Sequence, residues 1–323
     1  VPGWTGPQLW RSYRGIKNCS SPESNVRINL NWKHSKMQIT NPDVLKDDYE
    51  HQGFVVVDEL FEKGEVAEFQ RVTNELVEQS GSLRKSDPQF DLEPEHSEAN
   101  PRVQRIKVPH KRNEVFGQAV RNPKLLQMLK ILLGENVRFR NSKLNIKAAH
   151  GGSAVDWHQD WAFYPHTNTD LLAVGIMIDD IDEDNAPLMV VPQSHLGKTL
   201  NHHHKGIFSG SVDLKNEDID ISTAVKITGK AGSASFHHVK TLHGSSQNFS
   251  NRPRRLLLFE FAAADAWPLV NFEGYGDFSE YEEKIVIGKN TLQPRCENVD
   301  MIMPYPKPPN ADSIYRIQES RKK

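Results

Sequence analysis

The stretch VRFRNSKLNIKAA (residues 137–149) is where the pattern of the chain changes. From this point on, short segments of β-type residues are separated by turns. These segments span residues 137–149, 171–178, 188–191, 224–228, 232–237 and 254–262. Many short strands of this kind predict an antiparallel barrel or a sandwich.

The chain before residue 137 has a more helical pattern. Apolar residues recur at helical spacing over residues 64–79 and 125–133, and the run FVVV (54–57) predicts a buried strand. The polar residues 80–101 are expected to form a loop near a bound molecule. The sequence therefore predicts a β-rich body with helices laid on one face.

The composition excludes several classes of protein. The 323 residues include 40 basic and 42 acidic side chains with interspersed signs, which leaves no basic patch for nucleic acid. No apolar run approaches the ~18 residues of a membrane helix. Two cysteines are too few for a disulfide framework, so we expect a reducing compartment, the cytoplasm. The oligomeric state stays open.

The segment DWHQDW (residues 156–161) contains side chains that can bind a metal. On a strand, side chains two positions apart project to the same side, so His158 and Asp160 can reach one ion. His243 supplies a second imidazole much later in the chain. Two histidines and one carboxylate leave three positions of an octahedral metal open, the geometry of non-haem iron(II) oxygenases. If His158 and Asp160 are considered without His243, a purely structural role of both residues at a turn is the alternative.

Arg254 stands at the start of the apolar run 256–261. An arginine that points inward from a barrel strand is a buried cation, which is costly unless an anion pairs with it. The carboxylate of a co-substrate is a natural partner, because a guanidinium binds it through two parallel hydrogen bonds. The alternative is that Arg252, Arg254 and Arg255 form a solvated basic turn.

In these motifs the chain resembles the phytanoyl-CoA dioxygenase family of 2-oxoglutarate oxygenases. Three pieces carry the resemblance: WHQD with the aromatic stretch behind it (157–165), NAPLMVVPQSH (185–195), and HGSSQN through the arginine (243–254). With GFVVV (53–57), they extend it over roughly residues 43–262. The second piece departs from the family pattern, because Ala186 and Gln193 stand where glycine is usual.

The resemblance implies a mainly β fold with flanking helices, a double-stranded β-helix of the jelly-roll or cupin-like type. It also implies Fe(II) at His158, Asp160 and His243, with 2-oxoglutarate and O₂ as co-substrates. The distal carboxylate of 2-oxoglutarate would meet Arg254. Further contacts to the co-substrate are expected from Ser245, Lys107 and Gln159.

The aromatic residues after the metal ligands are expected to line a substrate pocket, because they would lie at the mouth of the barrel. They are Trp161, Phe163 and Tyr164. A place in the plain core is the alternative.

The expected activity is oxidation, by default hydroxylation, of a small organic molecule, with release of succinate and CO₂. One alternative is desaturation, epoxidation or ring formation at the same iron centre, and the other is a non-catalytic cupin-like binding protein. We expect an irregular arm at 1–42, a catalytic domain at 43–265 and a C-terminal extension packed on the barrel at 266–323. The sequence does not name the substrate.

Replacing His158, Asp160 or His243 by alanine should abolish Fe(II) binding or turnover and leave the fold intact, because the core does not depend on these side chains. Iron content after reconstitution and circular dichroism measure the two effects. Full activity in all three variants would show that the metal ligands lie elsewhere.

Overall fold

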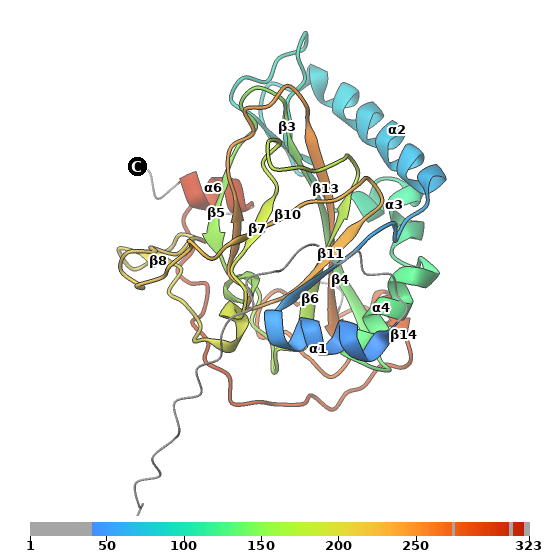
Figure 1. Cartoon of the computed structure of the whole chain (residues 1–323), viewed down its shortest axis with the longest axis vertical. Coiled ribbons are helices and arrows are strands. Elements are labelled where there is room, and N and C mark those ends of the chain that lie inside the picture. The colour runs from blue at the N-terminus through green and yellow to red at the C-terminus, as the bar shows by residue number, and fades with distance from the viewer. Residues whose placement is uncertain (1–40, 273–274, 310–312, 320–323) are drawn as a thin grey trace, which may run out of the picture. The chain divides into compact units, whose positions relative to one another are not determined.

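The computed structural model describes residues 41–272, 275–309 and 313–319 (Figure 1). The arm expected at residues 1–42 falls, except for its last two residues, outside this range.

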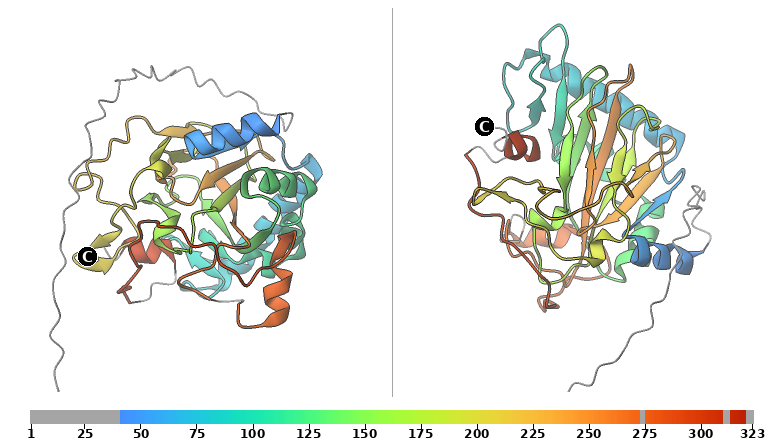
Figure 2. Two further views of the ribbon diagram at one scale, coloured as in Figure 1. Left: turned by 90° about the horizontal axis from the view of Figure 1, so that it is seen from below. Right: turned by 60° about the vertical axis from the view of Figure 1, so that its left-hand side comes forward.

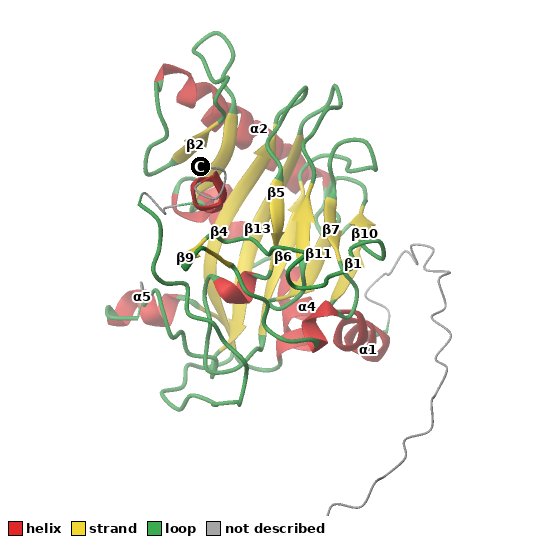
Figure 3. Ribbon diagram, turned by 90° about the vertical axis from the view of Figure 1, so that its left-hand side faces the viewer, coloured by secondary structure: helices red, strands yellow, loops and turns green. Residues whose placement is uncertain are grey.

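Strands dominate the fold and form two main antiparallel sheets (Figure 3). The larger sheet has the order β1 (Phe54–Val57), β11 (Ala234–His238), β6 (Leu171–Met177), β13 (Arg254–Ala263), β4 (Val137–Lys147), β3 (Val103–Lys107) and β2 (Phe90–Leu92), with β14 (Ile285–Ile287) also paired to β4. The smaller sheet has the order β10 (Val225–Ile227), β7 (Leu188–Val190), β12 (His243–Ser245) and β5 (Val155–His158). A separate pair joins β8 (His203–His204) to β9 (Ile207–Phe208).

Six α-helices accompany the sheets in the described residues. They are α1 (Pro42–Gln52), α2 (Lys63–Gln79), α3 (Glu114–Ala119), α4 (Pro123–Leu133), α5 (Phe278–Glu283) and α6 (Ile314–Glu319). Four short 3₁₀ turns are η1 (Ser80–Ser82), η2 (Pro109–Lys111), η3 (Asp160–Ala162) and η4 (Ser194–Leu196).

Local sequence explains where the main helices begin and end. The side chain of Asn122 accepts from two backbone N–H groups at the start of α4, and Pro123 follows at the first helical position. Gly53 ends α1 with a φ of 82°, a left-handed conformation that glycine adopts without strain. The predicted strands and the helices at 64–79 and 125–133 are confirmed.

The core lies on both faces of the larger sheet. Helices α2, α3 and α4 pack on one face, and the smaller sheet lies on the other (Figure 1). Along β13, Leu257 and Phe259 point to the helices, whereas Leu256 and Leu258 point to the smaller sheet, as expected for a strand with a period of two. Arg254 follows the parity of Leu256 and therefore faces the space between the sheets.

The chain after residue 265 contributes a strand and two short helices to the described fold. Strand β14 pairs with β4, and Gln318 of α6 donates to the carbonyl of Gly210 at 2.9 Å. Helix α6 lies on the opposite side of the strands from α2 (Figure 2). In the described ranges, no helix combines the length and the apolar character that a membrane crossing needs.

Phe259→Ala should lower the free energy of unfolding by about 3–5 kcal/mol, because Phe259 is fully buried and its removal leaves a cavity beside Phe139 and Phe261. Urea denaturation measures the change. Phe249→Ala, the same substitution at a side chain that is 74% exposed, is the control and should stay within about 0.5 kcal/mol of the parent. Equal losses in the two variants would contradict the assignment of Phe259 to the core.

Candidate metal centre

The pairing of β5 with β12 brings the two predicted histidine ligands together. His158 ends β5 and His243 begins β12, and the two Cα atoms are direct partners in the antiparallel register. The ring centroids lie 4.1 Å apart. The prediction that Asp160 lies on the same strand is wrong. Asp160 is the first residue of the 3₁₀ turn η3, which follows β5. One potential ligand atom from each of the three residues lies within 4.8 Å of the others.

Backbone carbonyls orient both imidazoles. Nδ1 of His158 lies 2.8 Å from the carbonyl oxygen of Asp156, and Nδ1 of His243 lies 2.9 Å from that of Thr241. A carbonyl only accepts, so Nδ1 carries the proton and Nε2 keeps a free lone pair. This is the tautomer that a metal ligand needs.

The centre is buried, and burial sets its protonation. Loss of solvent lowers the pKa of His158 well below its ordinary value and the pKa of His243 to about 4, so both rings are neutral at pH 7. Burial opposes the ionisation of Asp160, but Lys143 and the imidazole of His237 outweigh it and hold the pKa of this carboxyl well below its ordinary value. Two neutral imidazoles and one carboxylate are the donor set that suits Fe(II).

A small cavity of about 40 Å³ adjoins the three ligands. Arg254 forms part of its wall and is 2% exposed, and its Nε and Nη2 atoms donate to the carbonyl of Ala186 at 3.1 and 3.0 Å. Burial lowers the pKa of Arg254 to about 10, which leaves it charged at pH 7. No carboxylate of the described residues lies within 4 Å of this guanidinium. The alternative of a solvated basic turn is therefore wrong for Arg254. It holds for Arg252, which pairs with the exposed Asp182.

Other polar side chains complete the wall of the small cavity. Ser245, two residues after His243, is buried there, and Tyr315 reaches in from α6. Lys147, the register partner of Arg254, donates to the carbonyl of Ser246 at 2.7 Å, and burial lowers the pKa of this lysine well below its ordinary value.

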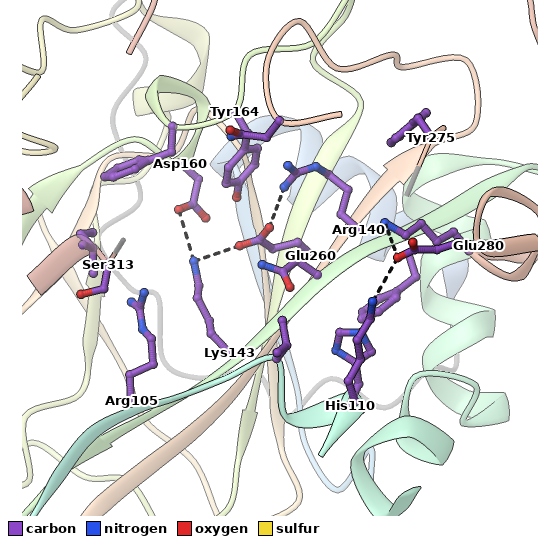
Figure 4. Close-up of a pocket in the computed structure, with 18 of the residues that line it drawn as sticks. Arg105, His110, Arg140, Lys143, Asp160, Tyr164, Glu260, Tyr275, Glu280 and Ser313 are labelled. Atoms are coloured by element: carbon purple, nitrogen blue, oxygen red, sulfur yellow. Dashed lines mark hydrogen bonds and ion pairs between the residues drawn. The ribbon is translucent and has the colours of Figure 1, made fainter. Parts of the chain in front are cut away.

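A larger cavity of about 910 Å³ opens on the other side of Asp160 (Figure 4). Phe163 and Tyr164 line it, as the sequence predicted for these two aromatics. Arg105, Lys143 and Asp160 line both cavities, so the two spaces meet at the metal centre.

Three predicted site residues lie elsewhere. Gln159 stands between two ligands and faces the opposite side, where its amide donates to the carbonyl of Lys240 at 2.9 Å and its oxygen accepts from Leu200 at 2.8 Å. Trp161 is fully buried among apolar residues, and its Nε1 donates to the carbonyl of Asp300 at 3.1 Å, so the alternative of plain core holds for it.

Lys107 is the third. Its ammonium lies 2.9 Å from Asp91 Oδ1 and donates to the carbonyl of Asp87 at 3.0 Å, and it lines neither cavity. Arg105, two residues earlier on β3, lines both cavities in its place. The expected loop 80–101, all of it described, contains η1 and the edge strand β2 and contributes no residue to either wall.

Several residues that line the small cavity were not predicted from the sequence. Lys143, Asn145 and Lys147 alternate with Leu144 and Ile146 along β4, so the period of two in this stretch was a usable signal. Arg105 and Tyr315 come from distant segments and carry no local signal.

His237 is a third imidazole near the centre. Its Nε2 lies 3.7 Å from Asp160 Oδ2, and its ring centroid lies 4.6 Å from that of His243. It is buried and lines the small cavity.

The two departures from glycine in the segment 185–195 keep a glycine-like backbone. Ala186 has a φ of 58° and Gln193 a φ of 64°, both in the left-handed region. The strained residue at 186 presents the carbonyl that accepts from Arg254, so the turn geometry serves the site even without glycine.

A buried group of two histidines and one carboxylate, beside a buried arginine, matches the ligand set of the non-haem iron oxygenases. The chain belongs to the phytanoyl-CoA dioxygenase family, whose model matches residues 49–256. A relative from Stutzerimonas stutzeri, described as a probable alpha-ketoglutarate-dependent hypophosphite dioxygenase, is 35% identical over 277 residues, covering 84% of this chain and 96% of that protein. The ectoine dioxygenase of Bordetella bronchiseptica is 30% identical over 226 residues, covering 64% of this chain and 70% of its own.

Solved structures agree on the fold. The crystal structure of EctD from S. alaskensis with 2-oxoglutarate and 5-hydroxyectoine matches with a TM-score of 0.61 at 21% identity and covers 84% of this chain and 92% of that one. The jelly-roll prediction is thereby confirmed. The protein is an Fe(II)- and 2-oxoglutarate-dependent dioxygenase, as its relatives are.

Behind the centre, His202 supports the backbone between the ligands. Its Nε2 accepts from the N–H of Gln159 at 2.8 Å, and its Nδ1 donates to the carbonyl of Leu200 at 2.8 Å. Burial lowers the pKa of His202 to about 4. The folded state therefore needs this ring neutral.

As the pH falls from ~6.5, the unfolded chain should take up a proton at His202 first, and the folded state should lose about 1.4 kcal/mol per pH unit until the pH approaches 4. We expect this contribution to be missing in His202→Gln, so its stability should fall less steeply over this window. Denaturation of the metal-free proteins from pH 7 to 4.5 measures the difference. Equal slopes would mean that His202 is not held neutral by the fold.

Proposed function

We propose that His158, Asp160 and His243 hold Fe(II) and that 2-oxoglutarate binds at the small cavity, with its distal carboxylate on Arg254. A volume of about 40 Å³ is smaller than 2-oxoglutarate, so the walls of this cavity have to move apart when the co-substrate binds. Bound there, Fe(II) supplies the activation of O₂ that couples decarboxylation of 2-oxoglutarate to oxidation of a second substrate. The products are succinate, CO₂ and the oxidised substrate, by default a hydroxylated one.

The burial of Arg254 carries this proposal. A guanidinium that is 2% exposed has lost nearly all of its hydration, and the carbonyl of Ala186 is a weak substitute for a counter-ion. A carboxylate that enters the cavity restores the balance through a bidentate, charge-assisted bond. The same cavity is lined by Arg254 and by all three metal ligands. One molecule with a carboxylate at each end can therefore contact the metal and the guanidinium of Arg254.

Ser245 and Tyr315 add hydroxyl groups to the wall of the same cavity. A hydroxyl can donate to a carboxylate oxygen, so both are suited to orient the co-substrate. Tyr315 belongs to α6, which gives the extension 266–323 a part in the site of the catalytic domain 43–265.

The larger cavity is the proposed place of the second substrate, because it begins at Asp160 and has room for an organic molecule. Phe163 and Tyr164 would be its aromatic walls. The two relatives named above are described as a probable hypophosphite dioxygenase and an ectoine dioxygenase, which supports a small molecule here. Desaturation or ring formation at the same centre is separated from hydroxylation by analysis of the product.

Arg254→Ala should weaken 2-oxoglutarate binding by more than a hundredfold, because loss of one partner of a buried pair costs about 3–5 kcal/mol. Arg254→Lys keeps the charge without the planar fork and should fall between the parent and alanine. The charge-transfer absorption that appears when 2-oxoglutarate is titrated anaerobically into the Fe(II) protein measures the affinity.

Iron binding should survive in both variants, since Arg254 is not a metal ligand. Arg252→Ala, which removes an exposed arginine from the same turn, is the control and should change the affinity by less than about twofold. Unchanged affinity in Arg254→Ala would place the co-substrate carboxylate elsewhere.

A further inference from the structure

The two cavities meet at a group of cations that 2-oxoglutarate does not account for. Arg105 lies on β3 with 9% exposure and lines both spaces. Its Nε donates to Asn145 Oδ1 at 2.9 Å, and its guanidinium stacks on the ring of Tyr315 at 5.2 Å. Figure 4 shows the guanidinium directed into the cavity on the side of Asp160 and Ser313. Among the described residues, no carboxylate comes within 4 Å of it.

Two further cations share a single carboxylate next to Arg105. Glu260 accepts from Lys143 at 3.0 Å and from Arg140 at 2.7 Å, and it is buried on β13 (Figure 4). Lys143 also lies 3.9 Å from Asp160 Oδ1, but that carboxylate belongs to the metal. The guanidinium of Arg140 is in addition fixed over the ring of Tyr164 at 4.2 Å. Lys143 and Arg140 together carry two positive charges and Glu260 one negative charge, so one positive charge of these three residues is unbalanced.

The charge balance of the loaded site makes the surplus explicit. Arg105, Arg140, Lys143, Arg254 and Fe(II) would together supply six positive charges, whereas Asp160, Glu260 and dianionic 2-oxoglutarate supply four negative ones. Lys147, also in the wall of the small cavity, carries no negative charge and so cannot reduce this surplus. A buried site with about two unbalanced positive charges is unfavourable until an anion enters.

The outer part of the larger cavity has no such surplus. Its cations Lys111, Lys284 and Lys307 are matched in number by Asp277, Glu280 and Glu283, and Glu280 pairs with two of the lysines. The excess charge is therefore confined to the region around the metal.

We propose that the second substrate carries an oxyanion, a carboxylate or a phosphonate, that binds to Arg105 and Lys143 beside the metal. The inference rests on the proposed function, because it counts Fe(II) and 2-oxoglutarate as bound. A guanidinium and an ammonium side by side suit either group, the first as a planar fork and the second as a point charge.

The rest of the cavity describes the remainder of this substrate. Phe163, Phe208 and Ile317 pack together and form an apolar part of the wall. A volume of about 910 Å³ holds a carbon skeleton as well as the anionic group. Hypophosphite, the phosphorus oxyanion in the name of the 35% identical relative, shares the anionic chemistry but would leave most of this space empty.

The test compares three probes of similar length that differ in head group: hexanoate, pentylphosphonate and hexanamide. Calorimetric titration into the anaerobic protein loaded with Fe(II) and 2-oxoglutarate should show at least tenfold tighter binding of one or both anions than of the neutral amide. The ratio between the two anions then identifies the preferred oxyanion. If neither anion binds more tightly than hexanamide, the proposal is wrong.

Arg105→Gln should weaken binding of the preferred anion at least tenfold and change the 2-oxoglutarate affinity by less than about threefold. The anion affinity of Arg105→Lys should fall between those of the parent and Arg105→Gln. Lys307→Gln removes the same charge at the exposed mouth of the cavity and is the control, with an expected change below twofold. Loss of 2-oxoglutarate binding with unchanged anion binding would assign Arg105 to the co-substrate and overturn the proposal. Failure of the parent protein to bind 2-oxoglutarate at all would instead contradict the proposed function.

Discussion

The antiparallel pairing of β5 with β12 is the constraint on which the site depends. It sets His158 opposite His243, two residues far apart in the chain, and the ladder fixes both Cα atoms. In each case the carbonyl two residues earlier fixes the ring, so orientation and tautomer also come from the backbone. A slip of one residue would turn one imidazole to the opposite face of the sheet and separate the ligands. The chemistry thus depends on strand register before it depends on any side-chain contact.

The second constraint is the burial of positive charge between the sheets. The alternation along β13 that sends Leu257 and Phe259 to the helices sends Arg254 and Glu260 to the cavity side. The apolar contacts on the helix face stabilise a sheet whose other face holds charges that are costly until their counter-ions bind. On this view the ligand-free protein carries an electrostatic cost that iron and the two substrates together relieve.

The sequence was informative where a spacing rule corresponds to a fixed geometry. The pair His158 and Asp160 and the later His243 met at one point as predicted, even though Asp160 lies in a 3₁₀ turn. The rule failed where direction within a turn decides the outcome: Gln159 and Trp161 flank the same ligand, yet both side chains leave the site. Lys107 lies on the same strand as Arg105, but its ammonium forms an ion pair with Asp91 on the neighbouring strand and does not reach the site. That competition is tertiary and has no signature in the local sequence.

If Fe(II) and 2-oxoglutarate bind at one site, their affinities are thermodynamically linked. When one ligand changes the affinity for another, the second changes the affinity for the first by the same factor. A 2-oxo acid that coordinates the metal should raise it. Calorimetric titration of 2-oxoglutarate under anaerobic conditions, with and without Fe(II), gives that factor. We expect 2-oxoglutarate to bind at least about tenfold more tightly when Fe(II) is present. Equal affinity with and without the metal would show that 2-oxoglutarate does not reach the iron, and would contradict the assignment of the small cavity.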